Sequence, residues 1–95
     1  MIEKKVPKLN PDLYLEKMDN EILLYSLSGT KAVYLNETAV LIWELCDGNR
    51  TVEEVIDLLE QAYPQQAEQI HADVITTIKT LFANRAIELM MGNDE

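Results

Sequence analysis

The segment Lys31–Cys46, KAVYLNETAVLIWELC, is the most informative part of this 95-residue chain, because its hydrophobic period changes near the middle. Apolar residues up to Leu35 follow the two-residue period of a strand, and those after Asn36 recur at the spacing of a helix. Asn36 is suited to cap this helix, because its side chain can accept a hydrogen bond from an amide of the first turn. The stretch therefore predicts a strand that leads directly into a helix.

Two further runs rich in Tyr, Leu and Ile precede this strand, at Tyr14–Met18 and Glu21–Ser26. The separators Asp19-Asn20 and Ser28-Gly29-Thr30 consist of residues that favour turns, since Asn, Asp and Gly tolerate a positive φ. Three strands in an antiparallel meander are the expected result.

Helix signals follow in the second half of the chain. Gly48 is expected to end the first helix. The segment Thr51–Glu54 has the spacing of a capping box that opens a second helix, and Pro64 closes it. A third helix, starting between residues 66 and 70 and ending near Asn84, places apolar residues on one face: Ile70, Val74, Ile78 and Leu81.

The order of elements predicts an α+β, winged helix-turn-helix-like fold, with a three-stranded antiparallel sheet followed by three helices. We expect one domain over residues 14–90, because 95 residues with 47% hydrophobic and 26% charged residues suit a single core. Residues 1–13 contain two prolines and are expected to form an N-terminal arm rather than core. Ala86–Met90 forms either a short strand or a packed tail, and residues 91–95 a flexible tail.

The charge distribution limits the classes of partner. Residues 1–35 carry five bases and five acids, whereas residues 36–95 carry three bases and twelve acids, so the whole net charge of −9 lies in the second half. Nucleic acids and anionic membrane surfaces attract cationic proteins, so both are disfavoured as partners. No apolar run has the length of a signal peptide or a membrane span, and we expect a cytoplasmic protein.

Residues that could carry catalysis or bind a metal are scarce. Cys46 is the only cysteine and His71 the only histidine, so neither a disulfide nor a zinc site is expected. Cys46 falls on an apolar helical face, where an inert buried thiol is expected, and Trp43 is expected in the core of the same helix. We therefore expect no catalytic residue, no cofactor and no metal.

The sheet offers a different kind of chemistry, because a strand at its edge can accept an extended peptide as an extra strand. The run Lys31–Leu35 has no proline and one charge, so it lacks the usual features that protect an edge. If it is an edge strand, it can bind a peptide; a covered or central strand is the alternative. Tyr34 alternates with Val33 and Leu35, so one of the two sets faces away from the core.

The sequence also resembles the PqqD family over about residues 8–90. The resemblance is carried by several short segments with a specific spacing: Leu35–Ala39, Ile42–Gly48, Thr51–Val55, Tyr63, Asp73-Val74, Leu81 and Ile87. It implies a peptide recognition element that binds the leader of a ribosomally synthesised precursor peptide by strand addition. Such a protein presents the peptide to a modifying enzyme, of radical SAM type in pyrroloquinoline quinone (PQQ) biosynthesis, and has no catalysis or cofactor of its own.

In this family the peptide lies between the third strand and the third helix. The resemblance therefore assigns the strand side of the site to Lys31, Ala32, Val33, Tyr34 and Leu35. One flank of the third helix carries Asp73, Thr77, Thr80 and Asn84, and the other carries Ile75, Lys79 and Phe82. We favour Ile75, Lys79 and Phe82 as peptide contacts, because Ile75 and Phe82 extend the apolar surface beyond a narrow core stripe.

Three alternatives stay open at this point. Leu27–Lys31 stands where members of the PQQ pathway carry a Pro-Glu-Arg-like stretch, so a related pathway with another precursor peptide is equally consistent. A winged-helix DNA-binding regulator is a second reading of the fold, although the negative charge opposes it. A small acidic adaptor that docks on an enzyme is the third.

Overall fold

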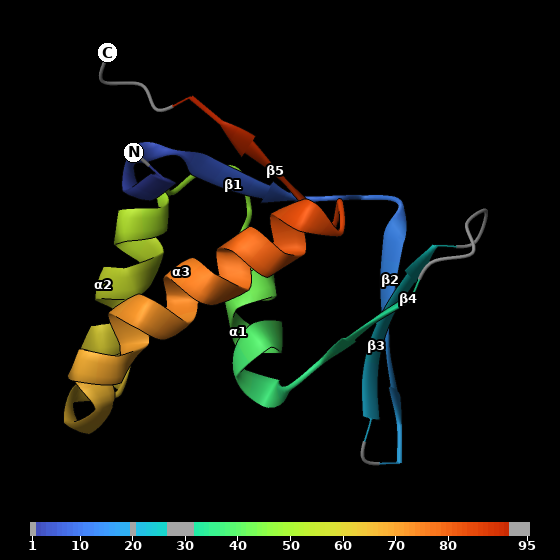
Figure 1. Cartoon of the computed structure of the whole chain (residues 1–95), viewed down its shortest axis with the longest axis horizontal. Coiled ribbons are helices and arrows are strands. Elements are labelled where there is room, and N and C mark those ends of the chain that lie inside the picture. The colour runs from blue at the N-terminus through green and yellow to red at the C-terminus, as the bar shows by residue number, and fades with distance from the viewer. Residues whose placement is uncertain (1, 20, 27–31, 92–95) are drawn as a thin grey trace.

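The computed structural model describes residues 2–19, 21–26 and 32–91 of the chain (Figure 1). The elements run in the order η1 Ile2–Lys4, β1 Val6–Leu9, β2 Leu13–Met18, β3 Glu21–Ser26, β4 Ala32–Leu35, α1 Glu37–Leu45, α2 Val52–Ala62, η2 Pro64–Gln66, α3 Ala67–Ala83 and β5 Ile87–Met90. The expected α+β order, a three-stranded antiparallel sheet followed by three helices, is confirmed. Strands β1 and β5 add a small second sheet.

The three-stranded sheet has the order β2-β3-β4, with both pairs antiparallel. Leu24 is opposite Leu15 on β2 and Val33 on β4. Leu24 is 1% exposed, and the other two side chains pack against the core from the same face. Asp19 has the positive φ of 55° expected in the turn after β2, whereas Asn20 and Ser28-Gly29-Thr30 lie outside the described residues.

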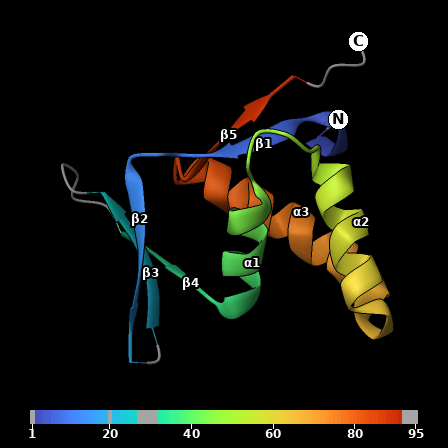
Figure 2. The ribbon, with the colours of Figure 1, turned by 180° about the vertical axis from the view of Figure 1, so that it is seen from behind.

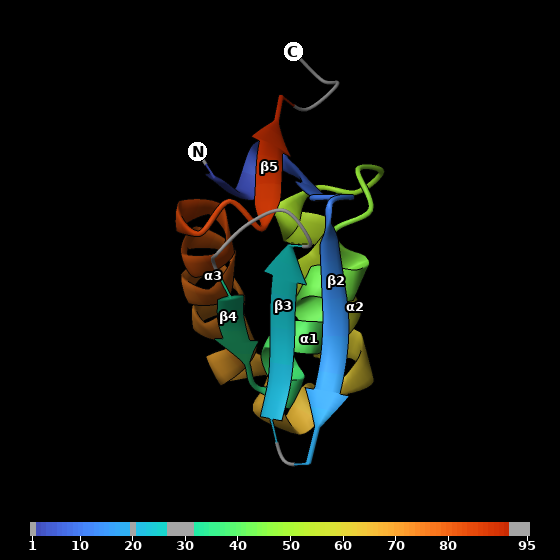
Figure 3. The same ribbon diagram turned by 90° about the vertical axis from the view of Figure 1, so that its right-hand side faces the viewer.

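The opposite face of this sheet is open, and the helices lie behind it (Figure 3). Tyr34 is 69% exposed on this face, which answers the question that the alternation in β4 left open, because Val33 and Leu35 pack against the core. Two more tyrosines share the open face, with the ring centroids of Tyr14 and Tyr25 5.9 Å apart. The sheet therefore buries one apolar face and presents aromatic side chains on the other.

Helix α1 begins directly after β4, as the change in period predicted. The Asn36 side chain accepts a hydrogen bond of 2.7 Å from the amide of Ala39 and so caps the helix. Trp43 and Cys46 are buried, as expected, and the Trp43 indole N–H donates to the carbonyl of Ala86 at 3.4 Å. This bond connects α1 to the segment that leads into β5.

Helices α2 and α3 also follow the sequence signals. The hydroxyl of Thr51 and the carboxylate of Glu54 form the predicted capping box, and α2 ends before Pro64. Helix α3 packs against both α1 and α2, and α1 crosses it on the side seen in Figure 2. The predicted face of α3 is buried in full: Ile70, Val74, Ile78 and Leu81.

The N-terminal segment differs from the expected arm. Val6–Leu9 forms strand β1, which pairs antiparallel with β5, and Pro7 within it is fully buried. The sequence pattern misled because a proline is usually read as a loop, yet proline is tolerated in an edge strand, where its missing N–H breaks no ladder. Of the two alternatives for the segment before the C-terminus, a short strand or a packed tail, the strand is correct, since Ile87–Met90 forms β5.

Backbone bonds attach β1 to the helices. The Leu9 amide donates to the Cys46 carbonyl at 2.7 Å, and the Gly48 amide donates to the Pro7 carbonyl at 3.0 Å. Gly48 has a φ of 82°, and a Cβ built on it would lie 3.3 Å from the Lys8 side chain. Gly48 does not end α1 as the sequence predicted, because the helix ends at Leu45 with Cys46 as its C-cap; Gly48 lies in the following loop and contacts β1.

We expect Gly48→Ala to lower the free energy of unfolding by about 1–2 kcal/mol, because a residue with a Cβ is strained at this positive φ. Urea denaturation of the variant measures the loss. Asn49→Ala is the matched control, since Asn49 is exposed and the substitution should change stability by less than about 0.5 kcal/mol. Equal stability of Gly48→Ala and the wild type would contradict the role given to Gly48.

Candidate functional site

The outer edge of β4 is the main candidate for a binding site. Among the described residues β4 pairs only with β3, so the backbone groups on its other side have no strand partner. Ala32–Leu35 contains neither a charged residue nor a proline. Both absences leave this edge able to pair with an extended peptide. Lys31, which the sequence assigned to the same site, lies outside the described residues.

Helix α3 runs beside this edge, as Figures 1 and 3 both show. Val33 and Leu35 of β4 pack against a core cluster that includes Val74, Ile78 and Leu81 of α3. The strand and the helix thus share the same core, and the question is which flank of α3 is turned toward the open edge.

The flank with Ile75, Lys79 and Phe82 continues from His71. The Nε2 atom of His71 lies 3.7 Å from a carboxylate oxygen of Glu3, so this flank begins next to η1 at the N-terminus. Ile75 is partly buried against the core, Lys79 is exposed, and Phe82 is 51% exposed. These three residues therefore follow the side of α3 that meets the N-terminal segment.

The flank with Asp73 faces the other way. Asp73 lines a hollow together with Glu37 and Thr38, the first two residues of α1, which follow β4 after one intervening residue. At 100° per residue Thr77 and Thr80 fall on the same flank as Asp73. This flank is therefore the one nearer to β4, which differs from the flank that we favoured from sequence.

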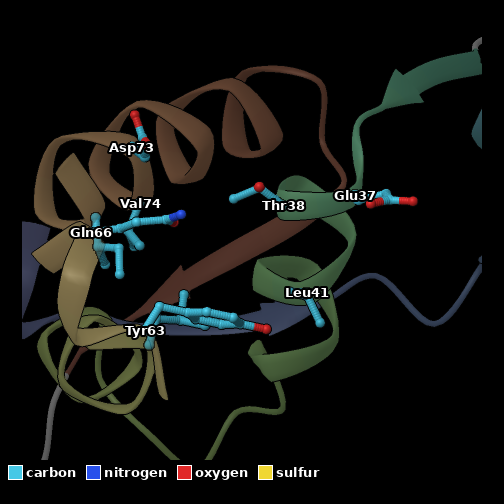
Figure 4. A pocket seen from close by; sticks show the side chains of 9 residues that line it. Glu37, Thr38, Leu41, Tyr63, Gln66, Asp73 and Val74 are labelled. Carbon is cyan, nitrogen blue, oxygen red and sulfur yellow. The ribbon is translucent and has the colours of Figure 1, made fainter. Parts of the chain in front are cut away.

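The hollow between α1, α2 and α3 was not predicted. It has a volume of about 230 Å³, and Figure 4 shows Tyr63, Leu41, Thr38 and Val74 around it. The lining comes from the start of α1, the end of α2 and the first half of α3: Glu37, Thr38, Leu41, Leu59, Tyr63, Gln66, Ile70, Asp73 and Val74. One signal was available in the sequence, since Thr38 and Leu41 lie on one face of α1, away from its buried face.

The electrostatic character of the helices is strongly negative. Helices α1, α2 and α3 together carry eight carboxylates and one lysine. The field of these groups attracts cationic partners and repels phosphates, so the alternative of a DNA-binding winged helix has no support from the charge on its helices.

Side chains suited to covalent or metal chemistry are few in the described part of the chain. No group of three or more His, Cys, Asp or Glu residues there is arranged to hold a metal ion. Cys46 is buried, and burial, with a smaller contribution from the charge of Asp47, raises the pKa of its thiol to about 12. A nucleophilic cysteine needs a thiolate, so Cys46 is a structural residue. None of the described helices is both long enough and apolar enough to cross a membrane.

Comparison with known proteins adds two findings. The model of the family described as Coenzyme PQQ synthesis protein D (PqqD) matches residues 21–87. Among solved structures, TbiB1 in complex with the TbiA(beta) leader peptide superimposes with a TM-score of 0.66 at 20% sequence identity, over 85% of this chain and 94% of that one. The second match shows a shared fold. No protein with a curated description matches this sequence significantly.

We expect Cys46 to resist an aromatic disulfide reagent at pH 8 in the native protein and to react fully once the chain is unfolded. The pKa of about 12, against an ordinary value of 9.0, lowers the thiolate fraction by at least about a hundredfold. Because the pKa is raised in the folded state, the free energy of unfolding keeps its full value below pH 9 with respect to this thiol and falls as pH rises from 9 toward about 12. Labelling at equal rates in native and unfolded protein would contradict the burial.

Proposed function

The chain belongs to the PqqD family, and from this we propose that it binds the leader of a ribosomally synthesised precursor peptide. The leader adds as a strand to the open edge of β4, and the complex is presented to a peptide-modifying enzyme, such as a radical SAM enzyme. The pathway is PQQ biosynthesis or a related one, since Leu27–Lys31 departs from the Pro-Glu-Arg-like stretch that members of the PQQ pathway carry at this place. These five residues lie outside the described part of the chain.

The free edge of β4 is the observation that carries this proposal. The first strand of the sheet, β2, is also an edge, but it carries charged Glu16 and Lys17, whereas described β4 carries none. Charged side chains on an edge disfavour pairing with another strand, so β4 is the better acceptor. The fold shared with TbiB1, a protein solved with a leader peptide bound, is consistent with this use of the sheet.

The strand side of the proposed site consists of Ala32, Val33, Tyr34 and Leu35, together with Lys31 from the sequence. On the helix side we now propose Asp73, Thr77 and Thr80 in place of Ile75, Lys79 and Phe82. The reason is that Asp73 lines the same hollow as the first residues of α1, the helix that follows β4. The other flank begins at His71, which lies next to Glu3 in the N-terminal segment. A peptide beside β4 would thus meet short polar side chains that can accommodate its own.

The protein has a non-catalytic role in this proposal. Backbone hydrogen bonds supply most of the affinity in strand addition and need no reactive side chain. The modifying enzyme then supplies the chemistry.

Proline substitutions in β4 test strand addition. Backbone donors along an edge strand alternate between the neighbouring strand and the free edge, so only one of Val33→Pro and Tyr34→Pro removes a free donor. We expect that variant to stay folded and to lose at least about tenfold in affinity for the leader. Candidate leaders come from short reading frames beside this gene, and titration into ¹⁵N-labelled protein measures binding.

Whichever of Glu16→Pro and Lys17→Pro in β2 stays folded provides the control, since it removes a donor from the other edge of the same sheet and should leave the affinity unchanged. Unaltered leader affinity in the β4 variant that keeps a native fold by circular dichroism would exclude β4 as the acceptor.

Substitutions at two neighbouring residues of α3 test which flank of the helix contacts the peptide. Thr80→Tyr places a bulky ring on the flank nearer β4, and we expect a loss of at least about tenfold in leader affinity. Lys79→Tyr places the same ring on the other flank, and we expect no more than about a twofold change. Both positions are exposed, so the stability of the two variants should be similar. Isothermal titration calorimetry decides the question, and the reverse order of affinities would restore Ile75, Lys79 and Phe82 as the peptide contacts.

A further inference from the structure

We propose that the hollow between α1, α2 and α3 receives an apolar side chain of the peptide, and that this side chain comes from a residue next to a basic one. The inference rests on the proposed function, because it names the chemistry of the peptide beyond the end of β4. It concerns three residues that strand addition does not use, Leu41, Tyr63 and Glu37, together with Asp73, which lies on the helix side of the proposed site and also lines the hollow.

The hollow lies where an added strand would arrive after leaving β4. Strand β4 ends at Leu35, Asn36 caps α1, and Glu37 and Thr38 of the first turn already line the hollow. Asp73 lines it from α3, on the flank nearer β4 (Figure 4). A peptide that continues past Leu35 in the direction of the strand therefore reaches the hollow within a few residues.

The walls of the hollow are apolar and partly open to solvent. Leu41 is 41% exposed and Tyr63 is 46% exposed, while Ile70 and Val74 of α3 are buried beneath them. Figure 4 shows the ring of Tyr63 extending toward Leu41, with Val74 on the side of α3. A volume of about 230 Å³ is enough for one aromatic or branched aliphatic side chain, and filling it would remove apolar surface from water.

The charge around the hollow is negative and not neutralised. Glu37 and Asp73 are exposed lining residues, and within the described ranges neither forms a salt bridge. The lining contains no lysine or arginine. In Figure 4 the Glu37 side chain points away from the hollow, so the two carboxylates act from its rim. A ligand whose positive charge stays outside the hollow, next to its apolar group, is attracted by them, whereas a second copy of this chain, with its own net charge of −9, would be repelled.

Three small molecules of similar size test the proposal without knowledge of the leader: phenethylammonium, 2-phenylethanol and 3-phenylpropionate. They share a phenyl ring and differ in the charge at the other end. Each is titrated into ¹⁵N-labelled full-length protein at low ionic strength, and amide shifts are followed at Thr38, Leu41, Gln66 and Val74.

We expect the cation to bind with a Kd of about 1 mM, in the range typical of such small ligands, and to move these four amides together. It should bind about threefold to tenfold tighter than the anion, and added salt should reduce the difference, because the carboxylates are exposed. The affinity for 2-phenylethanol should lie between those for the cation and the anion.

Two pairs of variants assign the contacts. Tyr63→Ala should weaken all three molecules, while Leu58→Ala, an equally exposed apolar residue of α2 that does not line the hollow, should not. Asp73→Asn should reduce the preference for the cation by about half, whereas Asp57→Asn, also outside the lining, should preserve it. Failure of all three molecules to shift these amides, or tighter binding of the anion, would overturn the proposal.

The outcome is independent of strand addition. Whichever of Val33→Pro and Tyr34→Pro stays folded should bind the three molecules as the wild type does, because neither residue lines the hollow. Loss of leader binding with retained binding of the cation would therefore reject the role of β4 alone. Two results together would reject the hollow while leaving strand addition intact. The wild type would fail to bind the cation, and Tyr63→Ala would bind the leader as tightly as the wild type does.

Discussion

The single residue that joins β4 to α1 constrains most of this structure. Asn36 ends the sheet on one side and caps the helix on the other through a 2.7 Å hydrogen bond to the Ala39 amide. With a one-residue connection, β4 cannot move away from the helices, and its apolar residues Val33 and Leu35 must pack into their core. The other side of β4 is then left as an edge beside α3. An open strand next to a helix is a direct consequence of this short link.

The groups that can bind a partner lie at the surface of this protein, and the core is apolar. The described core contains no buried charged or polar residue, and burial raises the pKa of its one cysteine thiol to about 12. Binding capacity lies in the backbone of β4, in the apolar hollow and in the carboxylates of the helices. This distribution suits a protein that holds a peptide for another enzyme, since strand pairing positions a chain without altering it.

Backbone pairing and the hollow would make different contributions to recognition. Strand addition accepts many sequences, because it depends on amides and carbonyls that every peptide shares. A hollow that fits one apolar side chain, with Glu37 and Asp73 beside it, selects by size and by charge. The negative field of the helices would increase the rate of encounter with a cationic segment. Affinity from the edge and selectivity from the hollow would together define which leader is bound.

The local elements could be predicted from the sequence, because capping, helical period and turn formation depend on neighbours along the chain. Asn36, the box of Thr51 and Glu54, and the buried stripe of α3 all formed where the pattern predicted them. Three features depended on residues far apart in sequence. The pairing of β1 with β5 buried Pro7, the flank of α3 that starts at His71 came to lie beside Glu3, and residues of three helices enclosed the hollow around Tyr63. Periodicity identifies the two flanks of a helix, but only the packing of distant segments decides which of them faces an open strand.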